Sequence, residues 1–515
     1  MTGRLAAANI TTPNTATSVY RCRTSGAAFI SVSICNRGTE TAEITLSVTD
    51  AANSSDVETV IEYKTELVPK NVLVRTGVAV SSTQYLTVTS TVANVSVVAT
   101  GTETGTFDDS ISEIAIVYFD ALSGPLTLDD ENVYGTSAGD QFGRSVAVSG
   151  DKTIVGAFGE DAATGTGTGA AYIINTSGTL IHTLANPGGA ANDGFGLSVD
   201  ISGNTAVVGA YGHNTYTGRA FVYNVGTGAL EHTLSPPTPA QNITFGRRVA
   251  TDGVNAIINS PTEASNGGAS GTASEGKAYI FNVSTGALVH TLDHPNSSGG
   301  DSSYDGFSND AVDISGNYAI VGAYNETPVG GKAYIFNVSS GALVHTLDNP
   351  NVDGAATTDR FGSAVAIDGD YAVVGNHTEY YSSGSTGDGV VYIYRVSTGE
   401  LLHTVASPVQ GGTDEYGNFG KTVAVSGYYA VIGSENYSVP SSSNGRAYVV
   451  DVRTGTVVQT IENPNVYGDG IQDKFGSAVA IHNRTLVIGA YTEDEAGATD
   501  AYSADDSGKA YVYQG

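Results

Sequence analysis

The stretch DQFGRSVAVSGDKTIVGA, residues 140–157, contains the pattern that decides the fold. A Phe-Gly pair opens a run of alternating apolar residues, a Ser-Gly-Asp turn follows, and a second apolar run comes after it. Alternation with a period of two is typical of β-strands, and Gly or Asp tolerates the positive φ of a tight hairpin. The stretch therefore predicts a β-hairpin.

Nearly the same sequence pattern occurs seven times along the chain, and consecutive copies are 50 to 62 residues apart. A fixed period of this length indicates a repeat architecture. We expect the phenylalanine of each copy to pack between neighbouring repeats. These residues are Phe142, Phe195, Phe245, Phe307, Phe361, Phe419 and Phe475.

Each repeat contains four short alternating runs. In the copy that begins at Phe361 they read FGSAVAIDG, YAVVGN, VVYIYRV and LLHTV, with glycine-containing turns between the first and second and between the third and fourth. Four antiparallel strands repeated seven times are typical of a β-propeller, whose radial arrangement protects the strand edges. We therefore predict a seven-bladed β-propeller over residues 126–515.

The fourth strand of the last repeat is missing from the C-terminal end. Seven third-strand phrases follow Phe142, but only six fourth-strand phrases do. The segment ALSGPLTLDDENVYG, residues 121–135, imitates the missing phrase. We predict that this N-terminal strand closes the ring, and that deleting residues 505–515 would destabilise the whole ring.

Residues 1–104 lie outside the repeat period. Seven alternating runs separated by turn residues predict a small antiparallel β-sandwich there, with residues 105–125 as a linker and docking segment. The whole chain is thus expected to be all-β.

The amino-acid composition limits the classes of binding partner that the chain can have. The chain of 515 residues has 22 basic and 52 acidic residues, a net charge of -30, which disfavours binding to nucleic acid or to anionic membrane surfaces. The first residues lack the long apolar core of a secretory signal, and no stretch of 18 apolar residues follows, so we expect a soluble chain made in the cytoplasm. Cys22 and Cys35 are either a free pair in a reducing compartment or a disulfide.

The repeated phrase, FG followed by SVA and then AVVGA, resembles the FG-GAP repeat of integrin-α-type propellers over residues 126–515. That resemblance implies the fold more than a function. Integrin-type repeats often carry an Asp-x-Asp-x-Asp-Gly calcium loop, but the hairpins of this chain are too short and none places three carboxylates at alternating positions. No metal and no cofactor is therefore expected.

The first hundred residues resemble small β domains of virion proteins from tailed phages, especially marine and cyanobacterial ones. The resemblance is carried by a CNRG turn, a central L-x-P-x-N step and the closing run YLTVTSTVANVSV. It implies that residues 1–104 attach to other virion proteins in the capsid, neck or tail, with the propeller displayed and the protein oligomeric on the particle.

Two sets of polar residues recur in the repeats and are candidates for a binding site. The five histidines of the fourth strand would lie far apart around a ring, so they are expected to be structural. Five aspartates stand two residues before the repeat phenylalanine; they either accept backbone N–H bonds in the turn or form a carboxylate ring that binds cations at the channel mouth. The histidines are His182, His232, His290, His345 and His403, and the aspartates are Asp140, Asp193, Asp305, Asp359 and Asp473.

Length varies most between the second and third strands of the repeats, where long polar loops are predicted. Such loops on a rigid ring are where binding usually resides. Aromatic and acidic side chains there could stack on sugars and accept hydroxyl hydrogen bonds, or simply be solvated. The candidates are Tyr380, Tyr381, Tyr437, Tyr502 and Asp500.

No catalytic motif is present, because there is no Gly-x-Ser-x-Gly elbow, His-Glu-x-x-His or phosphate loop. The acidic run Glu493, Asp494 and Glu495 is more simply a hydrated loop. The expected function is therefore a non-enzymatic phage virion structural protein, a fibre or decoration protein whose propeller binds a host-surface glycan or simply extends the particle. The alternatives are a bacterial secreted or surface adhesin and, less favoured, a polysaccharide-degrading enzyme.

Overall fold

The computed structural model divides into two compact units, Met1–Asp120 and Ala121–Gly515. In the first unit it describes residues 2–10, 17–21, 27–36, 41–49, 59–67, 72–81, 85–90 and 95–103. In the second it describes residues 122, 124–129, 139–161, 167–264, 275–296, 306–326, 330–351, 359–379, 389–408, 417–436, 438–439, 442–443, 445–464, 473–493 and 507–514.

The N-terminal unit contains two four-stranded antiparallel sheets. The first has the order β1 (Thr2–Ile10), β8 (Val95–Glu103), β3 (Ala27–Asn36), β6 (Val72–Ser81), and the second the order β2 (Thr17–Arg21), β7 (Tyr85–Ser90), β4 (Ala42–Thr49), β5 (Thr59–Leu67). Alternate side chains are buried, such as Val32 and Ile34 in β3 and Leu86 and Val88 in β7. One-sided burial of this kind is what a sandwich requires. The sandwich itself stays a prediction. The redox state of the cysteine pair also stays a prediction, because Cys22 lies outside the described residues.

The second unit contains seven four-stranded antiparallel sheets, which we number as blades 1 to 7 in chain order. Blade 1 consists of β10 (Phe142–Ser149), β11 (Lys152–Ala157), β12 (Ala170–Asn175) and β13 (Leu180–Ala185). Blade 2 consists of β14 (Phe195–Ser202), β15 (Thr205–Ala210), β16 (Arg219–Asn224) and β17 (Leu230–Leu234). Blade 3 consists of β18 (Val249–Thr251), β19 (Asn255–Ser260), β20 (Lys277–Asn282) and β21 (Leu288–Asp293).

Blade 4 consists of β22 (Phe307–Ser315), β23 (Tyr318–Ala323), β24 (Lys332–Asn337) and β25 (Leu343–Asp348). Blade 5 consists of β26 (Ala364–Asp368), β27 (Tyr371–Asn376), β28 (Val390–Arg395) and β29 (Glu400–Ala406). Blade 6 consists of β30 (Thr422–Ser426), β31 (Tyr429–Ser434), β34 (Arg446–Asp451) and β35 (Thr456–Glu462). Blade 7 has the order β36 (Ala478–His482), β37 (Thr485–Ala490), β38 (Lys509–Gln514), β9 (Leu126–Leu128).

Little else is regular within the described residues. A two-stranded hairpin, β32 (Ser438–Val439) with β33 (Ser442–Ser443), lies between the second and third strands of blade 6. The one helical segment described is α1 (His213–Tyr216), which lies in blade 2 between β15 and β16. Among the described residues no helix is long and apolar enough to cross a membrane.

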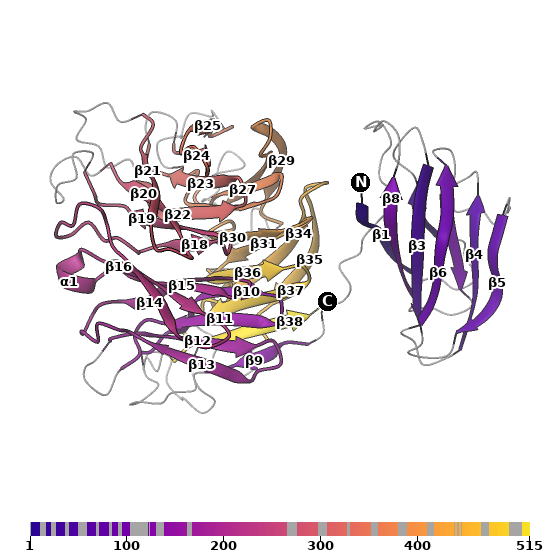
Figure 1. Ribbon diagram of the computed structural model, residues 1–515, viewed down its shortest axis with the longest axis horizontal. Coiled ribbons are helices and arrows are strands. Elements are labelled where there is room, and N and C mark those ends of the chain that lie inside the picture. Colours follow the sequence, from indigo (N-terminus) through magenta and orange to yellow (C-terminus); the bar gives the residue numbers. More distant parts are fainter. Residues whose placement is uncertain are drawn as a thin grey trace. The chain divides into compact units, whose positions relative to one another are not determined.

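The blades form a closed ring. The first strand of each blade contacts the first strands of both neighbours, from β10 through β36 and back to β10, so these inner strands surround the central axis (Figure 1). The second and third strands are buried on both faces; in β11, for example, five of six residues are buried. Apolar residues on both faces let each blade pack against the next.

The ring closes through the N-terminal strand, as the sequence predicts. Violet β9 lies antiparallel beside yellow β38 in Figure 1, with Leu128 opposite Ala510 and Leu126 opposite Val512. Leu128 is 3% exposed, and it belongs to the apolar cluster that joins blade 7 to blade 1. The all-β class, the seven blades and the closing strand are thus confirmed.

The Phe-Gly pair explains how the blades join. All seven phenylalanines are fully buried, and Phe195 packs in one cluster with side chains of blades 1 and 2. The following glycine approaches the preceding blade: Gly143 has φ +85°, and a Cβ there would lie 2.2 Å from the Lys509 carbonyl oxygen of blade 7. Only glycine fits such a left-handed close approach at no cost.

Blade 4 carries serine where the other six repeats have this glycine. Ser308 keeps the left-handed backbone, with φ 60°, and its hydroxyl donates a 2.7 Å hydrogen bond to the equivalent carbonyl, that of Lys277 in blade 3. A buried hydrogen bond compensates for the backbone strain. The exception therefore preserves the same contact between blades.

Candidate functional site

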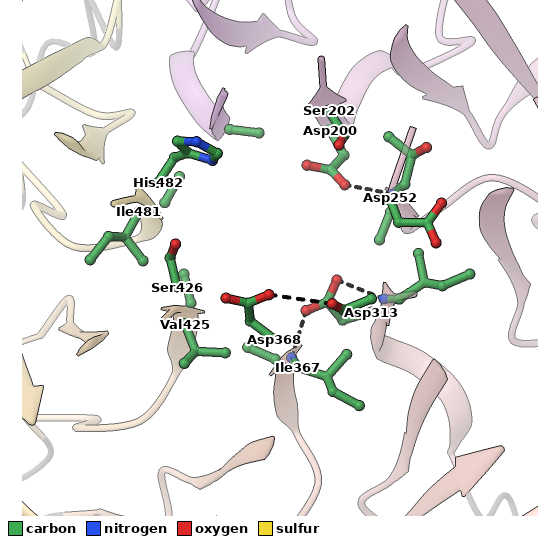
Figure 2. A pocket seen from close by; sticks show the side chains of 18 of the residues that line it. Asp200, Ser202, Asp252, Asp313, Ile367, Asp368, Val425, Ser426, Ile481 and His482 are labelled. Atoms are coloured by element: carbon green, nitrogen blue, oxygen red, sulfur yellow. Dashed lines mark hydrogen bonds between the residues drawn. The ribbon is translucent and has the colours of Figure 1, made fainter. Parts of the chain in front are cut away.

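The inner strands enclose a cavity of about 720 Å³ at the mouth where they end. Figure 2 shows its labelled polar side chains arranged around an open centre. Among the described residues that line it there is no Lys or Arg. This mouth is therefore electronegative and rich in hydrogen-bond acceptors. Its ionisable side chains are Asp200, Asp252, Asp313, Asp368 and His482.

Two of these carboxylates hold neighbouring blades together. Asp200 accepts hydrogen bonds from its neighbour Ile201 N at 2.9 Å and from Thr251 N of blade 3 at 2.6 Å. Asp313 repeats this arrangement with Ile314 N at 2.8 Å and Ile367 N of blade 5 at 2.7 Å. Alanine stands at the matching position of the other five inner strands, so these two aspartates are substitutions into a repeated apolar position.

Burial raises the pKa of both aspartates. Loss of hydration raises the pKa of Asp200 to about 7, against the opposing effect of its two backbone N–H donors. Loss of hydration, followed by the negative charge of Asp200, raises the pKa of Asp313 to about 8. The cavity wall therefore changes charge near neutral pH.

A second set of side chains bridges the blades at the end of each inner strand, two residues beyond the position of Asp200 and nearer the hairpin turn to the second strand. Asp368 accepts a hydrogen bond from Gly427 N of blade 6 at 2.7 Å, and Ser426 accepts one from Asn483 N of blade 7 at 3.1 Å. Ser149 does the same with Gly203 N of blade 2 at 3.0 Å. Short polar side chains at this position thus join the inner hairpins into a ring.

The mouth offers acceptor oxygens, hydroxyls and one imidazole, His482, for a ligand on the axis. This arrangement suits hydrogen bonding to hydroxyl or ammonium groups. Within the described part of the chain no three His, Cys, Asp or Glu side chains are grouped so as to hold a metal ion.

The loop residues predicted to bind ligand lie outside the described residues. This applies to Tyr380, Tyr381, Tyr437, Asp500 and Tyr502. Of the acidic run, Asp494 and Glu495 also lie outside, whereas Glu493 is described and is 1% exposed. The prediction of a hydrated loop is therefore wrong for Glu493, which is a buried residue of blade 7.

The five histidines of the fourth strands are distributed around the ring, one in each of blades 1 to 5. The Nε2 atom of His232 lies 3.1 Å from the Ser284 carbonyl oxygen, in the turn between the third and fourth strands of blade 3. His182, His290 and His403 make the same contact with the next blade. His345 packs against the equivalent turn, where a Cβ on Gly399 would lie 2.8 Å from its Nδ1. Their placement joins the blades at the outer rim.

The aspartates before the repeat phenylalanines bind side-chain amides. Asp193 accepts a hydrogen bond from Asn186 Nδ2 at 2.8 Å, and Asp359 accepts one from Asn349 Nδ2 at 3.0 Å. Asp473 is bonded in the same way to Asn463, and Asp140 is buried, whereas Asp305 lies outside the described residues. The partner observed for Asp193, Asp359 and Asp473 is a side-chain amide of the same loop, whereas the sequence offered backbone N–H groups of the turn or a cation-binding carboxylate ring. These carboxylates stabilise the connection between blades.

A buried glutamate with a tyrosine partner recurs and was missed from the sequence. The Tyr172 hydroxyl donates to Glu160 at 2.7 Å in blade 1, and the Tyr392 hydroxyl donates to Glu379 at 2.6 Å in blade 5. Tyr334 with Glu326 and Tyr511 with Glu493 form the same pair. Each glutamate comes three residues after the second strand, so the spacing was a signal that could have been read.

Blade 2, which lacks the glutamate–tyrosine pair, supports the link between the two positions. His213 stands where the glutamate would be, and Phe221, which has no hydroxyl, stands where the tyrosine would be. His213 Nδ1 instead lies 3.2 Å from Asp193 Oδ2. Both positions therefore differ in blade 2, as expected for a buried acceptor that needs its donor, whereas blade 6 keeps Tyr448 but has Tyr437 at the glutamate position.

Burial also raises the pKa of two of these glutamates. Loss of hydration raises the pKa of Glu379 to about 7 and that of Glu493 to about 8, although the tyrosine hydroxyl opposes the shift in each case. Glu326 differs: burial raises its pKa, but hydrogen bonds from His294, Asn296 and Tyr334 outweigh burial and lower it.

Comparison with known proteins agrees with the blade structure. The family model described as FG-GAP repeat matches residues 134–174, 179–223, 352–394 and 470–513, which cover most of blade 1, the first three strands of blades 2 and 5, and β36 to β38 of blade 7. No curated protein matches the chain. The second unit is therefore a seven-bladed β-propeller that contains FG-GAP repeats.

Proposed function

We propose that this protein is a structural component of a tailed-phage virion, anchored by residues 1–104 and displaying the propeller as a non-enzymatic adhesion module. The repeats and the fold are consistent with an adhesin-like role, since integrin-type propellers carry the same repeat. The virion setting is supported by the resemblance of the first hundred residues to small phage virion domains.

The observation that carries the proposal is that the ring closes within residues 126–514. β9 supplies the last strand of blade 7, so none of the eight strands of residues 2–103 is needed to complete the propeller. A self-contained ring and a separate set of sheets suit a display module joined to an attachment module.

The role of the propeller as a binding module is supported by its rigid construction. Hydrogen bonds between neighbouring blades occur at the cavity wall, at the Phe-Gly step and at the outer rim. A rigid ring holds the loops at its faces in fixed positions, which reduces the entropy lost on binding.

The experiment is sedimentation with purified virions. Full-length protein and a variant lacking residues 1–120, which keeps the closing strand β9, are tagged and mixed with particles from the source lysate that lack the endogenous protein. We expect the full chain to sediment with the particles and the variant to stay in the supernatant. A variant with an intact ring is confirmed as folded by its unfolding transition.

Other outcomes favour other functions. If neither protein sediments with virions but both bind bacterial cells, the bacterial adhesin becomes the better reading. If either protein shortens a polysaccharide chain, with loss of cleavage on replacing cavity carboxylates, the protein is an enzyme and the non-enzymatic role is rejected.

A further inference from the structure

The connection between the second and third strands of blade 2 has a left-handed backbone. Asn214, Thr215 and Tyr216 have φ values of 51°, 58° and 59°, so three consecutive residues other than glycine adopt the left-handed conformation. Elsewhere in the described part of the chain, non-glycine residues with positive φ occur singly. The segment α1 is therefore a left-handed turn, and Figure 1 shows it at the margin of the ring.

This left-handed turn is strained. An L-residue other than glycine is destabilised in this conformation, because its Cβ comes too close to the following carbonyl oxygen. Asn tolerates the conformation better than most residues, whereas a β-branched residue such as Thr215 adopts it rarely. Strain that the surrounding structure maintains is concentrated at functional sites. The turn is therefore a place to look for a binding role.

The length of the connection does not impose the strain. In blade 2 the connection is residues 211–218, and in blade 4 it is residues 324–331, which is the same length. Blade 4 has glycine at its left-handed positions, with φ 71° at Gly330 and 99° at Gly331. Blade 2 instead carries Asn, Thr and Tyr in the left-handed conformation. These side chains therefore replace glycines that a connection of this length can accommodate.

Backbone hydrogen bonds hold the turn in place. The N–H of Asn242 donates to the Thr215 carbonyl oxygen at 3.3 Å, and the N–H of Thr244 donates to the Tyr216 carbonyl oxygen at 2.8 Å. Both donors belong to the segment that leads into blade 3. Within the turn, the N–H of Tyr216 donates to the Gly212 carbonyl oxygen at 3.0 Å. The backbone that carries Tyr216 is thus fixed to two blades.

Two tyrosines lie together on the turn. Tyr211 follows β15 directly, and its ring centroid lies 6.0 Å from that of Tyr216, with an interplanar angle of 44°. A Cβ on Gly194 would lie 2.3 Å from Tyr211 Cε1, so the Tyr211 ring packs directly on the Gly194 backbone. Tyr216 remains 43% exposed. The pair therefore presents an aromatic surface to solvent on a rigid base.

Polar groups without net charge accompany the two tyrosines. Asn214 and Thr215 are exposed, and they supply amide and hydroxyl groups that can donate and accept hydrogen bonds. His213 is the one basic residue among residues 211–217, and its Nδ1 lies 3.2 Å from Asp193 Oδ2. The turn thus combines an aromatic surface with neutral hydrogen-bonding groups.

We propose that Tyr211, Tyr216 and the side chains of Asn214 and Thr215 form a binding site for a neutral sugar unit of a glycan. The apolar face of a sugar ring packs on an aromatic ring, while its hydroxyls exchange hydrogen bonds with amide and hydroxyl groups. This inference rests on the proposed function in one respect, that the propeller is an adhesion module, and it names the class of ligand and its place.

Two features favour a neutral glycan as the ligand. The net charge of -30 repels acidic polysaccharides and nucleic acid, and the basic residue of the turn, His213, already has an acidic partner. The strained turn holds its side chains in place before the ligand arrives, which reduces the entropy lost on binding.

The test is calorimetric titration of the full-length protein with defined polysaccharides. Dextran, mannan and galactan are neutral and differ in their hexose, whereas polygalacturonate is acidic. We expect at least one neutral polymer to bind, with an affinity that changes little with salt because no charge pair forms. Binding to none of the three, or tighter binding to polygalacturonate than to any of them, would overturn the proposal.

Variants of two exposed tyrosines locate the site. Tyr216→Ala is expected to bind about tenfold more weakly, because the stacking surface is lost, and Tyr216→Phe, which keeps the ring, should bind within about twofold of the wild type. The control is Tyr428→Ala. Tyr428 is 45% exposed and lies 6.4 Å from Tyr371 between ring centroids, but it belongs to the turn between the first and second strands of blade 6. Equal weakening by the two alanine variants would mean that any exposed tyrosine contributes, and the assignment would fail.

Thr215→Gly tests the role of the strained backbone. Glycine adopts the left-handed conformation without a Cβ contact, so the midpoint of thermal unfolding is expected to rise. Binding is expected to weaken about threefold, because the turn gains freedom that the ligand must remove and loses a hydroxyl. A higher midpoint with unchanged affinity would contradict a role of the strained turn in binding.

The titration and the sedimentation experiment can fail separately. The titration uses purified protein and polysaccharide and needs no virion. Its failure therefore leaves the sedimentation result standing, and a failure of sedimentation leaves the glycan result standing.

Discussion

Leu126 packs against Gly178, where a Cβ on the glycine would lie 3.2 Å from Leu126 Cδ2. Leu126 belongs to the closing strand, and Gly178 lies in the turn between the third and fourth strands of blade 1. At five other junctions a histidine occupies this position against the equivalent turn; at Gly286, for example, the histidine is His232. The closing strand thus reproduces the junction with an apolar side chain and no hydrogen bond.

The closing strand is expected to stabilise the entire ring. Replacing Leu128, which is 3% exposed, with alanine should lower the free energy of unfolding by about 3 kcal/mol, because it leaves a cavity between blades 7 and 1. Leu230→Ala, at a side chain 42% exposed, is the control and should change little. Urea denaturation followed by tyrosine fluorescence measures both, and equal effects would contradict a closing role.

The glycine of the Phe-Gly pair is expected to be intolerant of a side chain. Gly143→Ala should lower the free energy of unfolding by about 3 kcal/mol, because the new Cβ would meet the Lys509 carbonyl. Gly150→Ala is the matched control: its φ is +61°, nothing lies within 4 Å, and only backbone strain of about 1 kcal/mol is added. Similar losses in the two variants would show that the contact between blades is unimportant.

Asp200 is expected to contribute to the junction between blades 2 and 3. Asp200→Ala should lower the free energy of unfolding by about 2 kcal/mol, because Thr251 N loses its acceptor inside the cavity wall. Asp151→Asn alters an aspartate that is exposed and paired only with its neighbour Lys152, and it should leave stability unchanged. Denaturant midpoints of the two variants make the comparison.

Stability is expected to fall as pH rises from about 5 to about 8. The pKa of Glu493 is about 8 in the folded chain and near 4.5 when unfolded, so the folded state keeps a proton that the unfolded state releases. The contribution is complete below pH 4.5 and decreases by up to about 1.4 kcal/mol per pH unit until the folded pKa is passed. Glu379 adds to the effect up to about pH 7.

Glu493→Gln tests this dependence, because the amide cannot ionise and still accepts a hydrogen bond from Tyr511. We expect the variant to show a shallower decline of the unfolding free energy between pH 5 and pH 8. A decline as steep as that of the wild type would mean that Glu493 ionises normally in the folded chain.

The sequence was informative where a residue type repeats with the period. Phe142 and its six equivalents marked the blades, and the surplus phrase at residues 121–135 marked the closing strand, because both depend on local pattern and counting. The glutamates recur at the same place in five of the seven repeats and could have been paired with tyrosines through blade 2, where His213 and Phe221 depart together. The wrong expectation for Glu493 came from treating it as part of an acidic run with Asp494.

What the sequence by itself determined is the architecture: strand periodicity, hairpin glycines and the number of repeats set the class, the blades and the closure. Only the tertiary structure decided which side chains meet across junctions, such as Asp200 with Thr251 N or Arg144 with Tyr491. The reason is physical. Alternation is a property of neighbours along a strand, whereas contacts between blades join residues some 30 positions or more apart, whose proximity exists only once the blades have packed together.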